Sequence, residues 1–165
     1  MNVALESWEE RPLVIGTMLN PALVSVVLAA AAYRYESYGK LHMPAELIYI
    51  VAPLVLHRDT REALPKDNRS HLTNWVSKHP VLIAGFAARA LELVPVVQEG
   101  LRYGLRHQHL ALDQYGTLSS TYPAAKNPAR LGDIKAIVTA SARAGQWLAK
   151  TDSSATIYSL FGVTP

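Results

Sequence analysis

The sequence contains no cysteine, and only 18% of its residues are charged. Without cysteine the chain has no disulfide framework, no thiol nucleophile and no thiolate metal site. This absence fits a reducing compartment, and we expect a cytoplasmic protein. An average soluble domain has about 25% charged residues, so this chain has less surface that must remain in water. We therefore expect part of its surface to face a partner.

The sequence also lacks an apolar run long enough to cross a membrane. The most apolar stretch, PALVSVVLAAAA at residues 21–32, is short of the roughly 20 residues that a spanning helix needs. No basic segment precedes it, as a signal peptide requires, since the first ten residues contain three glutamates. We predict a buried helix over residues 21–38 that begins after the N-cap Asn20, and no membrane contact.

Half of the residues are hydrophobic, which excludes a disordered tail and predicts one folded domain. We divide the chain into an arm over residues 1–19, a core over 20–120, and a linker with C-terminal helices over 121–165 that pack on the core. Proline and glycine punctuation and apolar spacing predict the helices. After the first helix, the predicted helices cover residues 44–57, 71–78, 80–105, 134–150 and 155–161. We expect a kink or break at Pro53, a cap at Ser70 for the helix over 71–78, and a kink at Pro95.

The helix expected from Pro80 has a broad apolar stripe. Its apolar residues recur at helical spacing and are expected to form the side that faces the core. They are Leu82, Ile83, Phe86, Ala87, Ala90, Leu91 and Val94. Trp75 and Trp147 lie in helices of the same apolar pattern, and we expect both in the core.

Residues 110–119 break the helical pattern. Leu110, Leu112 and Leu118 alternate with other residues around the turn sequence Asp113-Gln114-Tyr115-Gly116, which predicts a short β-hairpin. A helix followed by a small hairpin is the layout of a winged helix. The predicted fold class is therefore mainly α, a helical domain with a small hairpin that is winged-helix-like. The alternative is a helical domain with an incidental hairpin.

The sequence has six histidines but none of the usual catalytic patterns. There is no HExxH motif, no GxSxG motif and no glycine-rich phosphate loop. His107 and His109 are two residues apart, yet two ligands with only Asp113 nearby do not make a metal site. We expect no enzyme activity, no cofactor and no metal.

The segment PLVLHRDTREALP, from Pro53 to Pro65, is the most unusual stretch. An apolar helix leads directly into a group of charged and polar residues, with Asp59 or Thr60 placed to cap a following turn. One interpretation is a capped junction between two helices with solvated charges. The other is a corner that contacts a partner.

A mildly basic C-terminal third raises the question of DNA binding. Arg102 and Arg106 are four residues apart and share one face of the helix before the hairpin, where His107, Lys126 and Arg130 could extend the patch. A solvated or protein-binding face is the competing interpretation. In the N-terminal arm, Trp8 is a candidate exposed anchor for an interface.

Taken together, the order and spacing of several short motifs resemble the middle component of bacterial three-component ABC ATPase systems, which are conflict or anti-phage systems. The matching stretches cover nearly the whole chain. They include Glu10-Arg11-Pro12, Leu19-Asn20-Pro21-Ala22, the segment from Pro53 to Pro65, Leu72-x-x-Trp75, Phe86-x-x-Arg89-Ala90, Ala144-Gly145-x-Trp147-Leu148 and the terminal Ile157-Tyr158-x-x-Phe161-Gly162-Val163-x-Pro165.

The resemblance implies an adaptor that joins an SMC- or RecF-like ABC ATPase to a third, effector-bearing component. The expected partner contacts are Asn20, His57, Thr60, Arg61 and Arg89, together with Trp8 and Phe161 near the two termini. Weak or indirect DNA contact and a homodimer are compatible with this role. The alternative function is a winged-helix regulator that binds DNA.

Overall fold

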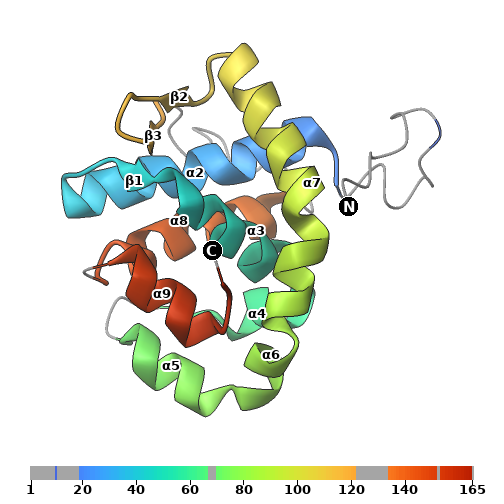
Figure 1. Ribbon diagram of the computed structural model, residues 1–165, viewed down its shortest axis with the longest axis vertical. Coiled ribbons are helices and arrows are strands. Elements are labelled where there is room, and N and C mark those ends of the chain that lie inside the picture. Colours follow the sequence, from blue (N-terminus) through green and yellow to red (C-terminus); the bar gives the residue numbers. More distant parts are fainter. Residues whose placement is uncertain (1–9, 11–18, 67–69, 122–133, 152, 165) are drawn as a thin grey trace.

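A computed structural model describes residue 10 and residues 19–66, 70–121, 134–151 and 153–164. Within these ranges the chain is mainly helical, with one small antiparallel sheet (Figure 1). Among the residues with predicted roles, Trp8, Lys126 and Arg130 lie outside the described ranges. None of the described helices combines the length and apolarity needed to cross a membrane.

Helix α2, Pro21–Gly39, is the centre of the fold. It packs most extensively against α8, Ile134–Leu148, and α7, Phe86–Arg106 (Figure 1). The Asn20 side chain accepts a hydrogen bond from the Ala22 backbone N–H at 2.8 Å, as the capping prediction requires. Residues 27–32 are fully buried, which confirms the predicted buried helix.

Glycines let the neighbouring helices approach α2 closely. A Cβ atom on Gly145 of α8 would collide with the backbone of Ala31 in α2, and one on Gly100 of α7 would collide with the Val24 side chain. Since backbone cannot move aside as a flexible side chain can, Gly145 sets how near α8 lies to α2. The Ser141 hydroxyl adds a hydrogen bond across the same interface, to the Val27 carbonyl.

The second predicted helix is present in two parts. A 3-10 turn over Ala45–Leu47 leads into α3, Ile48–Leu56, and the helix continues through Pro53 before it ends at Leu56. A separate short helix, α4, covers Arg58–Ala63. The helix was expected to kink or break at Pro53, whereas the break lies four residues later, at the extended residue His57.

The next helices differ from the prediction at two points. Helix α5 covers Leu72–Lys78 without a side-chain cap, whereas Ser70 accepts a hydrogen bond through its carbonyl from the Trp147 indole. The long helix expected from Pro80 is divided at Gly85 into α6, Pro80–Ala84, and α7. Helix α7 then continues through Pro95.

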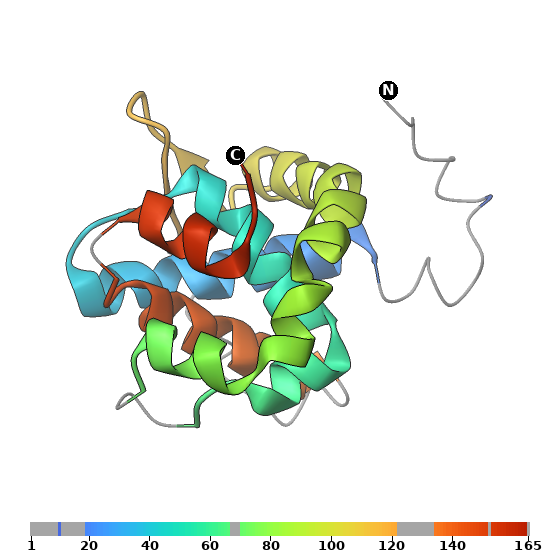
Figure 2. The same cartoon turned by 60° about the horizontal axis from the view of Figure 1, so that its bottom comes forward.

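The predicted hairpin is confirmed and belongs to a three-stranded sheet. Strands β2, Ala111–Leu112, and β3, Thr117–Ser119, are antiparallel, and β3 also pairs with β1, Met43–Pro44. Strand β1 was not predicted, because two residues before a helix carry no strand pattern of their own. The hairpin projects from the helical body (Figure 2). Its comparison with the wing of a winged helix stays a prediction.

The C-terminal helices pack on the other helices of the chain. Helix α9, Ser154–Phe161, lies against α5, and its last residue, Phe161, is fully buried (Figure 2). The ring centroids of Phe161 and Phe86 are 4.5 Å apart, and those of Trp75 and Trp147 are 5.4 Å apart. Both tryptophans are buried, which confirms their predicted place in the core.

Candidate interaction surfaces

The polar corner at His57 is held together by contacts within the chain. The His57 ring caps α4, because its Nδ1 atom accepts from the Thr60 backbone N–H at 3.3 Å and lies 2.8 Å from the Thr60 hydroxyl. Since Nδ1 accepts here, the proton of a neutral ring is on Nε2. Thr60 itself is fully buried. The cap is therefore His57 and not Asp59 or Thr60.

Arg61 connects α4 to the end of α3. One guanidinium nitrogen donates to the carbonyl oxygens of Val55 at 2.7 Å and Leu56 at 3.3 Å. These are carbonyls of the last turn of α3, which have no partner inside the helix. Arg61 therefore terminates α3 and fixes the angle at which α4 leaves it.

Arg89 has a similar role at the division between α6 and α7. Its guanidinium donates to the Leu82 carbonyl at 2.8 Å and lies over the Phe86 ring. A Cβ atom on Gly85 would be 2.7 Å from the same guanidinium, so glycine leaves the room that this arginine occupies. The Arg89 Nε atom is buried without a hydrogen-bond partner among the described residues.

Apart from Trp8, which lies outside the described ranges, the residues predicted to contact a partner form hydrogen bonds or core contacts inside the chain. Asn20 caps α2, His57 and Thr60 build the corner, and the Phe161 ring is enclosed between other aromatic rings. The Phe161 ring could reach a partner only if α9 moved away from the core. Partner contact by the other residues stays a prediction.

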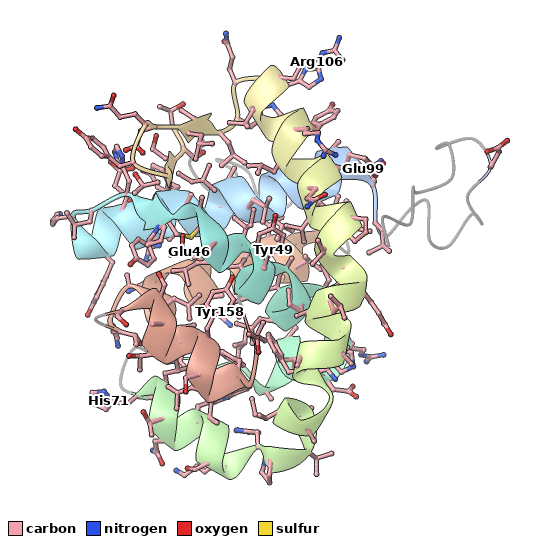
Figure 3. All side chains as sticks on the ribbon, in the orientation of Figure 1. Glu46, Tyr49, His71, Glu99, Arg106 and Tyr158 are labelled. Atoms are coloured by element: carbon pink, nitrogen blue, oxygen red, sulfur yellow. The ribbon has the colours of Figure 1, made fainter. Side chains whose placement is uncertain are left out.

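Of the residues predicted to touch DNA, the three that the structure describes lie at the C-terminal end of α7. Arg102, Arg106 and His107 are exposed there, and Figure 3 shows Arg106 at the end of the helix with Glu99 further back along it. The His107 ring is 4.2 Å from the Tyr103 ring. Among the described residues, Arg102 and Arg106 on one exposed turn form a small basic surface.

The two neighbouring histidines do not assemble a metal site with other ligands. The ring centroids of His107 and His109 are 6.1 Å apart. Across the described ranges, no group of three His, Asp or Glu side chains is arranged to hold a metal ion.

An apolar groove lies between α7 and α9. It has a volume of about 560 Å³, and Leu91 in its wall is 74% exposed although its helical spacing predicted a core position. The groove is lined by Tyr49, Ala87, Ala90, Leu91, Val94, Tyr158, Gly162, Val163 and Thr164. The apolar stripe of α7 is wider than the core can cover, and this excess width is the signal that could have located the groove in the sequence.

Tyr158 is the polar group in the wall of this groove. Its hydroxyl donates to the Glu46 carbonyl at 2.7 Å, and Figure 3 shows it near Glu46 and Tyr49. Burial, with smaller contributions from Glu46 and Tyr49, raises the pKa of the Tyr158 phenol to about 12. The phenol is therefore neutral at physiological pH, and its hydrogen bond ties α9 to the 3-10 turn that precedes α3.

The tip of the hairpin is a second exposed surface with apolar side chains. Tyr115 is 80% exposed and Leu112 is 48% exposed. Asp113 stiffens the turn by accepting hydrogen bonds from the backbone N–H groups of Tyr115 and Thr117 and from the Thr117 hydroxyl. These bonds, above all those from Thr117, lower the pKa of the Asp113 carboxyl. A stiff turn that presents a tyrosine is suited to contact with another protein.

Comparison with known proteins gives one match. The model of the family described as ABC-three component (ABC-3C) system Middle Component 3 matches residues 8–165, which is nearly the whole chain. Neither the curated proteins nor the solved structures include a match.

Proposed function

Because the chain belongs to the Middle Component 3 family of ABC-three component systems, we propose that it is a non-enzymatic adaptor. In this role it links an SMC- or RecF-like ABC ATPase to a third, effector-bearing component of a bacterial anti-phage complex in the cytoplasm. The observation that carries the proposal is the family match over residues 8–165, since a middle component works together with the other members of its system.

The described surface supports a role in binding proteins. An adaptor that holds two proteins needs two separate contact surfaces, and the chain has an apolar groove between α7 and α9 and an apolar hairpin tip. Leu91 and Tyr115, the most exposed large side chain of each, are of the type that a partner would cover. Both surfaces belong to elements that are anchored in the core.

Co-purification tests the proposal directly. The chain, the ABC ATPase and the third component encoded beside it would be purified separately, mixed at micromolar concentration and passed through size exclusion. An adaptor elutes with both proteins and brings them into one complex. Separate elution of the ATPase and this chain, or an ATPase that binds the third component equally well without it, contradicts the proposal.

Single substitutions then test the two surfaces. Leu91→Asp is expected to release one component and Tyr115→Asp the other, because each places a charge in an apolar contact. The matched control is Val81→Asp, since Val81 is 85% exposed on α6 and does not line the groove. If Leu91→Asp and Tyr115→Asp leave both affinities at the level of Val81→Asp, neither surface is a contact.

A further inference from the structure

A second depression, with a different chemistry, lies between α4 and α8. It has a volume of about 1010 Å³ and is formed by the outer side of α4, the residues that follow α4, and the first half of α8. The residues that line it are Arg58, Arg61, Glu62, Leu64, Lys66, Lys135, Ala136, Thr139, Ala140 and Arg143. We refer to these residues as the basic groove.

The charge of the basic groove is almost entirely positive. Its lining contains five cationic side chains and one carboxylate, Glu62, which is paired with Arg58 at 2.8 Å. Arg61 is directed to the carbonyls of α3. Within the described part of the chain, Lys66, Lys135 and Arg143 form no ion pair, so the groove keeps an excess of positive charge that favours an anionic ligand.

The shape of the basic groove suits an elongated ligand. Lys135, Thr139 and Arg143 are spaced four residues apart and follow one face of α8. On the opposite wall, Lys66 follows α4. Leu64, Ala136 and Ala140 add a narrow apolar strip to the lining, in which Ala136 is exposed and Leu64 and Ala140 are largely covered. Small side chains at this place allow another backbone to come close.

The lining distinguishes between two kinds of anionic ligand. Single-stranded nucleic acid is bound by cations together with aromatic rings on which the bases stack, and none of the described lining residues is aromatic. An apolar strip between basic walls matches instead a protein segment with acidic residues at its edges and small or aliphatic residues toward the groove.

We propose that the basic groove binds an acidic protein segment with interspersed aliphatic side chains, supplied by one of the other two components. The source of the segment rests on the proposed adaptor function, whereas the chemistry of the groove does not. Lys66, Lys135 and Arg143 attract and orient the acidic side chains, and the apolar strip, exposed at Ala136, receives the aliphatic ones.

A titration with synthetic probes tests the chemistry of the groove. The full-length chain would be titrated, with fluorescence anisotropy as the readout, into a labelled 20-residue peptide of glutamate, leucine and alanine, a control peptide with glutamine in place of glutamate, and a labelled oligo-dT of equal length. The acidic peptide should bind most tightly, and its affinity should fall as salt rises.

A charge-matched pair of variants locates the binding. In Lys66→Glu/Lys135→Glu/Arg143→Glu the affinity for the acidic peptide should fall by about tenfold or more. In the control Lys78→Glu/Arg102→Glu/Arg106→Glu, which changes net charge equally at exposed positions outside the groove, the loss should be clearly smaller. Circular dichroism and thermal melting would show that both variants are folded.

Three outcomes of the titration overturn the proposal. An equal loss in both variants assigns the binding to overall charge. Tighter binding of oligo-dT than of the peptide, lost in the groove variant, assigns the groove to nucleic acid. If the acidic peptide binds no more tightly than the glutamine peptide, charge does not contribute to binding in the groove.

The source of the segment is tested with the purified components. The groove variant should lose one component and keep the other, and a variant that binds both as tightly as the natural chain overturns this assignment. If the natural chain binds neither component, the adaptor function fails, while the peptide titration still decides the chemistry of the groove.

Discussion

The two sides of α4 use the same kinds of residues for different purposes. On the side toward α3, His57, Thr60 and Arg61 form hydrogen bonds within the chain and hold the corner in place. On the side toward α8, cations such as Lys135 and Arg143 surround an open groove and form no ion pair in the described ranges. The segment that is distinctive in the sequence thus holds the corner through His57 and Thr60, and it also supplies Arg58, Glu62 and Leu64 to the lining of the groove. The rest of the groove is built from residues far away in the chain.

The largest effect on stability is expected when Arg61 is removed. Arg61→Met leaves the Val55 and Leu56 carbonyls without their charged donor, and the free energy of unfolding should fall by about 1–2 kcal/mol. Urea denaturation followed by circular dichroism measures the change.

Arg58 of the same helix provides the matched control for Arg61. It is exposed and paired only with Glu62, so Arg58→Met should leave the unfolding midpoint unchanged. If the two substitutions destabilise the protein equally, the distinction between the two sides of α4 is wrong.

A smaller effect is expected at Asn20, another residue of the matched motifs. Asn20→Ala removes the acceptor for the Ala22 N–H and should cost about 1 kcal/mol of unfolding free energy. Asn20→Asp keeps an acceptor oxygen and should remain near the natural stability. If Asn20→Ala and Asn20→Asp lower the unfolding free energy equally, the acceptor oxygen of the cap does not stabilise the helix. If instead stability is unchanged and partner binding is lost, Asn20 is a contact residue.

Alkaline unfolding tests whether Tyr158 also acts within the chain. Since the pKa of this phenol is raised to about 12 in the folded protein from an ordinary value of 10.0, the folded state keeps a proton that the unfolded state releases. The stability that the protonated Tyr158 phenol supplies is fully present below pH 10 and is lost as the pH rises toward 12. Tyr158→Phe should therefore lose stability less steeply over this interval, as measured by urea midpoints. An identical pH slope in both proteins contradicts the role.

The smallest effect on stability is expected at the end of α7. Arg102→Glu/Arg106→Glu alters two exposed side chains, and the melting temperature should not change. In a gel-shift assay at low salt we expect no binding of duplex DNA by the natural chain. A shift that weakens steeply with salt and disappears in the double variant would instead support the DNA-binding alternative.

Much of the fold could be predicted because its signals are local. Asn20 starts α2 by capping it with its side chain, Pro21 and Pro80 suit the first helical position, and the turn around Asp113 and Gly116 produces the hairpin. Other features depended on contacts made elsewhere. The sequence pattern favoured one helix from Pro80, whereas the chain divides it at Gly85, where the Arg89 guanidinium donates to the Leu82 carbonyl.

The candidate site could be predicted only in part. The segment from Pro53 to Pro65 stood out in the sequence, and both interpretations given to it were compatible with its residues. The structure shows a capped junction, because the polar atoms of His57, Thr60 and Arg61 find partners within a few residues. The apolar groove beside Leu91 and the basic groove were both missed.

By itself the sequence determined a cysteine-free, mainly helical domain with a buried first helix, because composition, length and helix caps act on neighbouring residues. The tertiary structure alone decided which parts of each helix are covered. Leu91 shares the apolar spacing of Phe86, yet Leu91 is 74% exposed in the wall of an open groove, whereas Phe86 is fully buried against Phe161 of α9. Likewise, Lys66 and Lys135 line one groove only because the packing of α8 on α2 and α3 brings distant segments together.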